Sequence, residues 1–340
     1  MNRQYRLSAV AWMLAALVSF GVGAGWTSRA SAEPPGAELV LGMYDLETPL
    51  KRAVIDGDTV RVKGLDATLR LVGIDTEETF KHEDEKTAFA AGWKQYMTAR
   101  VASSPTPIKF ATPLGEAARE WAEIFFRDVT SVRLEIDELN RRRGYYNRYL
   151  AYILVERNGK WVNYNIEAVR AGMSPYFTKY GYSRRFHKEF TEAQAEAQKK
   201  KLGIWKKGAE CYPDYDKRLK WWHDRAETIE RFNKKYGDAP DVYELGIDAD
   251  WDALTKAEGK EVTVFGTVGD IKFGESPSRV YMSHKKGMDF TIVSFKAGLL
   301  ERLELEKHAG EYVYVRGRVT TYKGRPQFKL DDGPVKVWVE

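Results

Sequence analysis

The sequence predicts a mixed α+β chain, mainly β, in which two sheet-rich units are joined by a helical connector. Short runs rich in β-branched and aromatic residues recur along residues 38–163 and again along 245–340, with turn residues between them. Residues 208–240 instead carry apolar side chains at helical spacing. With 340 residues, the chain is long enough for one large domain or two ordinary ones with buried cores.

Composition limits the classes of function. Apolar residues make up 43% and aromatic residues 13% of the chain, which indicates a globular protein. The formal net charge is +5, but three of these charges, Arg3, Arg6 and Arg29, lie in the first 32 residues, so any polyanion site must come from local clustering. The single cysteine, Cys211, and the scattered histidines do not support a zinc site, a cysteine nucleophile or a histidine–metal motif. We therefore expect any metal to be held by oxygen.

Residues 1–32 have the layout of a secretory signal peptide. Arg3 and Arg6 precede an apolar run at 7–26, and an A-S-A cleavage site follows at 30–32. An uncleaved membrane anchor is the alternative, because the run is near the length that spans a bilayer. We predict an exported protein, periplasmic or secreted, without stable membrane association once the signal is cleaved.

The first unit is predicted at 33–207. A D-G pair at 56–57 should bend the second strand sharply. The segment 80–114 is long and polar and is expected to be an irregular insertion. Strands are expected at 38–44, 52–62, 68–75, 130–137 and 149–156, and helices at 116–128, 163–171 and 184–201.

Charged side chains gather on two neighbouring strands within Val54–Thr79. Asp58 lies on the first strand, and Arg70, Asp75 and Glu78 follow on or after the second. Taken singly, these residues are explained as turn or surface residues. Together, a guanidinium fork and several carboxylates can hold a cation and a phosphate.

Four strings match one known family in order over residues 38–207. They are I-D-G-D-T-V, L-R-L-V-G-I-D-T-E-E-T, N-R-Y-L-A-Y-I and E-A-Q-A-E-A-Q-K-K-K-L-G-I-W. The chain thereby resembles the thermonuclease family, the staphylococcal nuclease homologues. This resemblance implies an oligonucleotide-binding (OB) type barrel with helices and a calcium-dependent phosphodiesterase. Such an enzyme cuts DNA and RNA with little sequence preference and leaves 3′-phosphate ends.

The resemblance also implies roles for individual residues. Asp58 and Asp75 match the calcium carboxylates, and the carbonyl of Thr76 matches a third oxygen ligand. Arg70 and Arg148 match the two arginines that grip the phosphate. The chemistry suits these residue types, because calcium prefers oxygen ligands and fixed guanidinium forks stabilise the charge that builds on an attacked phosphodiester.

The remaining part of the family's active site is a carboxylate that positions or activates the attacking water. Glu78 matches it, but Glu77 precedes Glu78 where the family often has proline, so which glutamate faces the site stays open; the spacing from Asp75 favours Glu78. Asn147 stands where the family usually has glycine and tolerates the left-handed conformation. The loop after Glu78 is longer than usual in the family. Family tyrosines that contact the nucleotide fall near Tyr176 and Tyr180.

The last unit is predicted at 241–340, after the connector at 208–240. Six strand-like runs, with a helical stretch at 297–307 between the third and the fourth, resemble an OB-fold-like barrel. Such barrels bind single strands by stacking bases on aromatic side chains beside basic ones. Core packing is the equal alternative for each aromatic, and Phe265 and Phe290 are expected in the core. The candidates for substrate contact are Phe273, Tyr281, Tyr322, Lys323, Arg325 and Phe328.

Two hypotheses of different classes follow. The first is an exported Ca²⁺-dependent nuclease whose C-terminal barrel assists binding of nucleic acid, with single-stranded DNA or RNA favoured. The second is a non-catalytic nucleic-acid-binding or scaffold protein that keeps the barrels without the chemistry. The presence of every expected carboxylate and arginine favours the enzyme. Contact of residues 245–340 with protein or cell-wall polymer is a third option.

Overall fold

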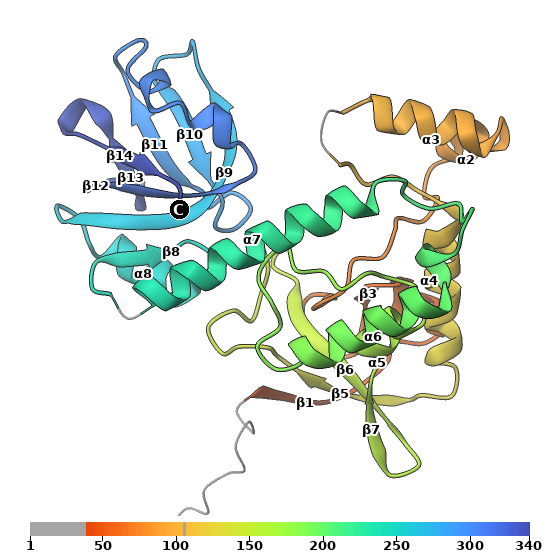
Figure 1. The fold of residues 1–340 in the computed structure, drawn as a ribbon. Coiled ribbons are helices and arrows are strands. Elements are labelled where there is room, and N and C mark those ends of the chain that lie inside the picture. The colour runs from red at the N-terminus through yellow and green to blue at the C-terminus, as the bar shows by residue number, and fades with distance from the viewer. Residues whose placement is uncertain (1–38, 105–106, 238) are drawn as a thin grey trace, which may run out of the picture. The chain divides into compact units, whose positions relative to one another are not determined.

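The computed structural model describes residues 39–104, 107–237 and 239–340 (Figure 1). The predicted signal peptide or anchor at 1–32 lies outside these ranges. Within them, none of the helices combines the length and the apolar character that a membrane crossing requires.

The first unit is built on a sheet with the order β1-β5-β6-β4-β3-β2, and β7 pairs with β6. A bridge between Leu46 and Val62 joins the ends of β1 and β3 and closes the sheet into a barrel. One neighbouring pair, β4–β6, is parallel. This is the predicted barrel, with the predicted turn between β2 and β3. The strands are β1 (Val40–Asp45), β2 (Val54–Asp56), β3 (Thr59–Val60), β4 (Leu69–Leu71), β5 (Ser131–Glu135), β6 (Tyr149–Arg157) and β7 (Lys160–Asn163).

Helices cover this barrel because each turns an apolar face inward. Helix α4 buries Ala118, Ala122 and Phe125, and the Thr112 side chain caps it by accepting a hydrogen bond from the Gly115 amide. A Cβ on Gly115 would lie 2.1 Å from the carbonyl oxygen of Glu78, so glycine lets the start of α4 approach that segment. The elements are α1 (Leu50–Ala53), α4 (Pro113–Phe125), α5 (Tyr164–Arg170), α6 (His187–Lys200) and the 3-10 turn η2 (Gly203–Trp205).

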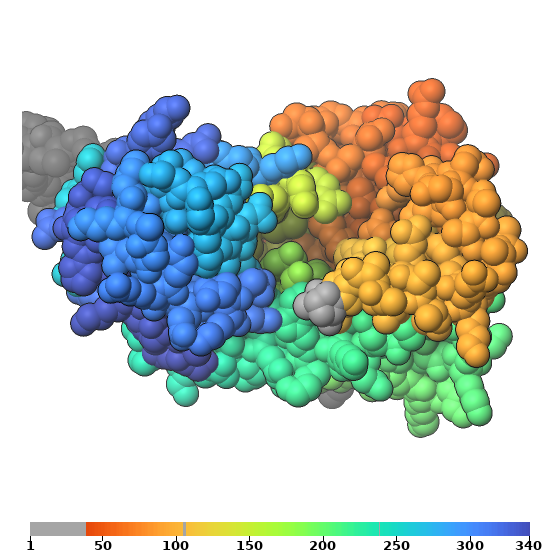
Figure 2. All heavy atoms as spheres, turned by 90° about the horizontal axis from the view of Figure 1, so that it is seen from above, coloured from red at the N-terminus to blue at the C-terminus, as the bar shows by residue number. Residues whose placement is uncertain are grey.

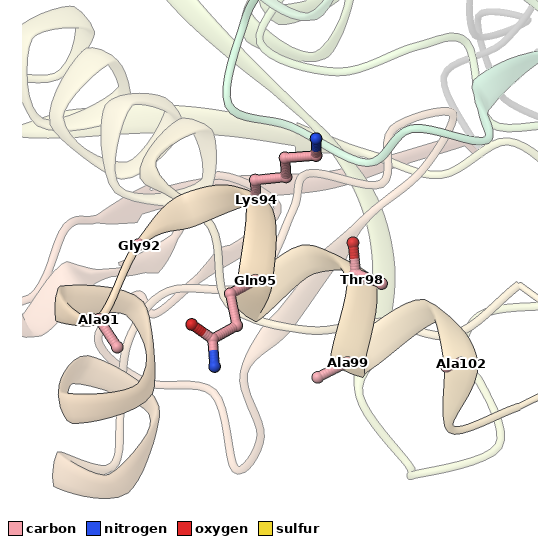
Figure 3. Close-up of a pocket in the computed structure, with 7 residues that line it drawn as sticks. All are labelled: Ala91, Gly92, Lys94, Gln95, Thr98, Ala99 and Ala102. Carbon is pink, nitrogen blue, oxygen red and sulfur yellow. The ribbon is translucent and has the colours of Figure 1, made fainter.

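The prediction of an irregular insertion at 80–114 was wrong. The described residues of this segment include two helices, α2 (Glu83–Ala90) and α3 (Trp93–Ala102), which appear as an orange lobe in Figure 2. Phe89 of α2 and Tyr96 of α3 pack with Phe110 into a small separate core. A hollow of about 650 Å³ lies along α3, but uncharged residues and Lys94 line it, and no carboxylate does (Figure 3).

The connector is helical, as predicted. Helix α7 (Tyr215–Tyr236) buries Trp222, Ala226 and Ile229, which belong to the predicted stripe. Further along the helix, Phe232 stacks on Phe265 of the last unit with ring centroids 4.1 Å apart. The apolar face of the connector is thus covered.

The last unit is a second barrel, in which β9, β10, β11, β13 and β12 form a closed ring because β12 also pairs with β9. The pair β11–β13 is parallel. Instead of the predicted helix at 297–307, two 3-10 turns occur. The elements are β8 (Val242–Glu244), α8 (Asp248–Thr255), β9 (Glu261–Lys272), β10 (Ser278–Met282), β11 (Phe290–Ser294), η3 (Glu301–Leu303), η4 (Leu305–His308), β12 (Tyr312–Tyr322), β13 (Arg325–Lys329), η5 (Leu330–Asp332) and β14 (Lys336–Trp338). The predicted α+β, mainly β class with two barrels is therefore confirmed.

Candidate active site

Strand pairing in the first barrel brings the predicted site residues together. Thr59 of β3 is paired with Arg70 of β4, which places the β2–β3 turn and its Asp58 beside that arginine. Because β4 runs parallel to β6 with Leu69 opposite Tyr149, the residue before Tyr149 arrives at the same end of the sheet. That residue is Arg148, which explains how a side chain so distant in sequence joins the group.

Arg70 holds two buried carboxylates at once. Its guanidinium forms ion pairs with Asp58 and Asp75, which are only 6% and 5% exposed. Burial acts to raise the pKa of Asp58, but the charges of Arg70 and Lys109 outweigh it and lower that pKa to about 2. The two carboxylates act in turn on the guanidinium, whose pKa they raise despite its burial.

The backbone fixes the two carboxylates further. Asp58 accepts a hydrogen bond of 3.0 Å from the amide of Thr76, and the amide of Asp75 donates to Ser174 Oγ at 2.8 Å. A Cβ on Gly57 would lie 2.6 Å from the Thr76 side chain, so the turn can approach Thr76 only with glycine there. The glycine of the D-G-D string is therefore required by the packing as well as by the turn.

Asp56 is a further acid of this cluster that was not among the predicted metal ligands. It accepts a hydrogen bond of 3.2 Å from the amide of Asp58. Burial and the nearby charge of Asp58 raise the pKa of Asp56 to about 7. The D-G-D string indicated that Asp56 could belong to an acidic cluster, but an ordinary turn explained the same string equally well.

The structure distinguishes Glu77 from Glu78. Glu77 is 1% exposed and accepts hydrogen bonds from the Thr112 hydroxyl, the Tyr212 amide and the Tyr215 hydroxyl, the last two at 2.6 Å. The Glu78 side chain is 34% exposed, and its carboxylate pairs with Lys81 at 3.1 Å. Glu77 points into the protein, whereas Glu78 lies at the surface of the carboxylate cluster.

Arg148 reaches the cluster through a hydroxyl group. Its Nη1 donates to Thr59 Oγ1 at 3.3 Å, and Thr59 donates to Asp58 at 2.9 Å. Asn147 before it has a φ of 62°, the left-handed conformation expected for that position. Within the described ranges no carboxylate lies within ion-pair distance of Arg148, so its guanidinium is available to an anionic ligand.

Lys109 is a site residue that the sequence did not reveal. Its Nζ lies 2.5 Å from Asp75 Oδ1 and 3.9 Å from Glu78 Oε1. It comes from the segment after α3, which was expected to be irregular. Nothing in the string P-I-K-F marks this lysine as different from a surface lysine.

The predicted metal ligands provide oxygen atoms only. Thr76 Oγ1 is buried and has no hydrogen-bond partner among the described residues, and the Thr76 amide donates to Asp58. Within the described ranges, no three His, Cys, Asp or Glu residues are arranged as a metal cluster, and the carboxylates of Asp58 and Asp75 pair with cationic side chains instead. The donor set suits a hard cation in kind, with two carboxylates and a backbone carbonyl.

The predicted substrate contacts of the first barrel divide into one exposed and one buried residue. Tyr180 is 59% exposed and lies within 5.7 Å of the Lys179 amine. Tyr176 is buried, stacks on Phe190 at 4.8 Å and accepts the Ser183 amide through its hydroxyl. A ring in the core cannot stack on a base, so the prediction for Tyr176 was wrong.

The predicted substrate contacts of the second barrel also include both exposed and buried residues. Tyr322, Lys323 and Arg325 are exposed around the β12–β13 turn, and the Lys323 amine lies 5.4 Å from the Tyr322 ring. Phe328 is fully buried against Phe290, so it was wrongly predicted as a contact. Phe273 and Tyr281 are half-buried, and Phe273 packs against the core. Phe265 and Phe290 are buried, as predicted.

Comparison with known proteins finds relatives for part of the chain. The family model described as "Staphylococcal nuclease homologue" matches residues 68–207. The chain is 31% identical over 159 residues to a thermonuclease of Staphylococcus hyicus, covering 45% of this chain and 72% of that protein. It is 27% identical over 166 residues to a thermonuclease of Staphylococcus intermedius, covering 47% and 77%. An uncharacterized protein of Methanocaldococcus jannaschii is 29% identical over 163 residues, covering 45% and 68%.

The family-model match runs from just before β4 to η2 and includes Arg70, Asp75, Glu78 and Arg148, whereas β1, β2, β3, Asp58 and the last barrel lie outside it. A shared fold alone would not establish a shared site. The matched segment contains β4 and β6, whose parallel pairing brings Arg70 and Arg148 to the same end of the sheet. The chain belongs to the staphylococcal nuclease homologue family.

Proposed function

We propose that the chain is an exported, Ca²⁺-dependent nuclease that hydrolyses phosphodiester bonds of DNA or RNA with little sequence preference. The observation that carries this proposal is the convergence of Arg70, Glu78 and Arg148 on the buried carboxylates Asp58 and Asp75. The family membership supports it, together with the surface position of Glu78 and the guanidinium of Arg148, which pairs with no carboxylate within the described ranges.

In this proposal the two arginines have different tasks. Arg148 binds a non-bridging oxygen of the phosphate, because its charge is not neutralised by a carboxylate within the described ranges. Arg70 is held by Asp58 and Asp75, so one face of its guanidinium is fixed before the substrate binds. Preorganised cations stabilise the charge that builds on the phosphate oxygens without reorganising during the reaction.

Glu78 orients the attacking water and accepts its proton. A carboxylate that is 34% exposed and lies at the surface of the cluster can reach a water beside the phosphate, and the buried Glu77 cannot. Asp58, Asp75 and the Thr76 carbonyl would hold Ca²⁺, which supplies a fixed positive charge beside the phosphate. By the family likeness, the products carry 3′-phosphates.

The second barrel would extend the binding surface for a single strand. Tyr322 offers a ring for base stacking, and Lys323 and Arg325 offer charges for phosphates. The apolar run at 7–26 with its A-S-A site supports export.

The test is cleavage of a single-stranded oligonucleotide by residues 33–340 in calcium or in chelator. We expect calcium-dependent cleavage that falls about a thousandfold in Glu78→Gln and in Arg148→Ala, while binding of the oligonucleotide persists. Arg143→Ala is the matched control, because Arg143 lies in the same turn but pairs with Asp66 and not with the cluster. Equal cleavage in chelator, or in both site variants, would reject the assignment. Binding without cleavage in the wild type would favour the scaffold hypothesis.

A further inference from the structure

Lys109 places a positive charge in direct contact with the carboxylate cluster. Its amine lies 2.5 Å from Asp75 Oδ1, the same oxygen that pairs with Arg70. The Lys109 side chain is 45% exposed, so it enters the cluster from the solvent side.

The main chain around Lys109 is held on both sides by buried groups. Arg218 of α7, which is buried, donates to the carbonyl of Ile108. The Tyr212 hydroxyl accepts from the Phe110 amide at 3.1 Å and donates to the Phe110 carbonyl at 3.0 Å. The Tyr96 hydroxyl donates to the Ala111 carbonyl at 3.0 Å. The position of Lys109 is therefore fixed by the α2–α3 lobe and the connector, and only its side chain is free to turn.

Asp75 Oδ1 already contacts two cations, Arg70 and Lys109, so a metal ion on this carboxylate would bring further positive charge to the same place. A divalent ion on Asp58 and Asp75 would lie within a few ångströms of the Lys109 amine, where like charges repel even at a partly solvated site. Without such an ion, the amine neutralises part of the charge of the surrounding acids, Asp56, Asp58, Asp75 and Glu78. Arg70 is different, because it bridges Asp58 and Asp75 and its side chain is only 14% exposed, whereas that of Lys109 is 45% exposed.

We propose that Lys109 is an internal cation that competes with the metal ion for Asp75. The amine holds the carboxylates together when no divalent ion is bound, and it must turn away from Asp75 when one binds. Lys109 therefore weakens metal affinity and makes the metal-free site more stable. This inference rests on the proposed calcium site, but its test measures binding and stability without cleavage.

The experiment is a calorimetric titration of residues 33–340 with Ca²⁺, together with thermal unfolding in chelator. Lys109→Met removes the charge at nearly constant side-chain length, and Lys109→Gln removes it but keeps a hydrogen-bond donor. We expect both variants to bind Ca²⁺ roughly tenfold more tightly than the wild type. We also expect both to unfold at a lower temperature in chelator, and the difference to shrink with saturating Ca²⁺.

Two lysines provide controls. Lys81→Met removes a charge that pairs with Glu78 at 3.1 Å and approaches Asp56 but does not contact Asp75, so its effect on affinity should be clearly smaller. Lys63→Met, whose partner is Asp45, should have none.

The outcomes separate this inference from the proposed function. Wild-type binding with equal or weaker binding by both Lys109 variants overturns the inference and leaves the calcium proposal standing. An equal gain in Lys81→Met also overturns it, because the effect would then be one of general charge. Ca²⁺ binding by the Lys109 variants but not by the wild type supports the inference. No binding by any variant overturns both.

Discussion

The two barrels share a frame and differ in what they place at the same position. Each is a closed ring with one parallel strand pair, β4–β6 in the first and β11–β13 in the second. In the first barrel, β4 carries Arg70 between two buried carboxylates. In the second, β11 and β13 bring Phe290 and Phe328 into edge contact at 4.8 Å.

The barrel fold by itself therefore does not specify the chemistry of the site. Both barrels have an apolar core, but only the first carries a buried charged cluster beside it. Buried charges are costly unless each has a partner, so this cluster persists only because guanidinium, amide and hydroxyl groups surround its carboxylates. The second barrel has an apolar contact beside its parallel strand pair, and its exposed charged and aromatic candidates lie at a turn. We therefore expect substitutions in the two barrels to affect different quantities.

The largest expected effect is on cleavage in the first barrel. Arg148→Ala should lower the rate of cleavage about a thousandfold, because it removes a preorganised cation from the phosphate. Its free energy of unfolding should change by less than about 1 kcal/mol, because no ion pair is lost with it. The measurements are single-turnover cleavage and urea unfolding, and an unfolding change as large as the loss of activity would give Arg148 a structural role.

Substitution of Arg70 and of Phe328 should show that each barrel depends on its own buried group of side chains for stability. Arg70→Met leaves the buried Asp58 without its guanidinium partner and Asp75 with Lys109 alone, and it should cost about 3–5 kcal/mol in chelator. Phe328→Ala leaves a cavity in the apolar ring and should cost a similar 3–5 kcal/mol. Urea unfolding of each variant measures both. Cleavage should be lost in Arg70→Met and retained in Phe328→Ala under conditions where both are folded; the reverse pattern would place the chemistry in the wrong barrel.

Glu77 should make the first barrel sensitive to pH. Burial raises its pKa from 4.5 to about 7. Because the folded pKa is raised, the stabilising contribution is complete below about pH 4.5 and is lost as the pH rises through about 7. Glu77→Gln cannot ionise, so between about pH 5 and pH 8 the wild type should lose on the order of 2 kcal/mol relative to it. Urea unfolding in chelator at both pH values measures this, and parallel pH profiles would show that Glu77 does not titrate in this window.

The smallest expected effect belongs to the surface of the second barrel. Tyr322→Ala should weaken binding of a single-stranded oligonucleotide by about 1–2 kcal/mol, the usual value of one stacked base. Arg325→Ala should weaken it less and reduce its dependence on salt. Fluorescence anisotropy measures both, with Phe295→Ala as an exposed aromatic control away from this turn. Equal losses in all three variants would mean that the turn is not a specific contact.

The strands and the central site residues were predictable because their signals are local. The alternation of β-branched residues marked β5 and β6, and the D-G pair marked the turn that presents Asp58. Arg148 could be named only through the family strings, since no local pattern connects it with Arg70; the parallel pairing of β4 and β6 supplies the physical reason.

The missed features depend on contacts between distant residues. Glu77 became buried because its partners Tyr212 and Tyr215 lie on the connector, 135 and 138 positions away. Lys109 contacts Asp75 only because the chain after α3 lies beside the barrel. The lobe itself carried a signal that the polar composition concealed, in the aromatic residues Phe89, Trp93 and Tyr96.

We propose that Glu78, at the surface of the cluster of Asp58, Asp75 and Arg70, orients and deprotonates the attacking water. Its neighbour Glu77 has a structural role in this proposal. The most direct test compares Glu77→Gln and Glu78→Gln in single-turnover cleavage of one oligonucleotide in calcium at about pH 8. We predict that Glu78→Gln loses about a thousandfold and that Glu77→Gln stays within about tenfold of the wild type. A larger loss in Glu77→Gln than in Glu78→Gln, with both proteins folded, would contradict the account.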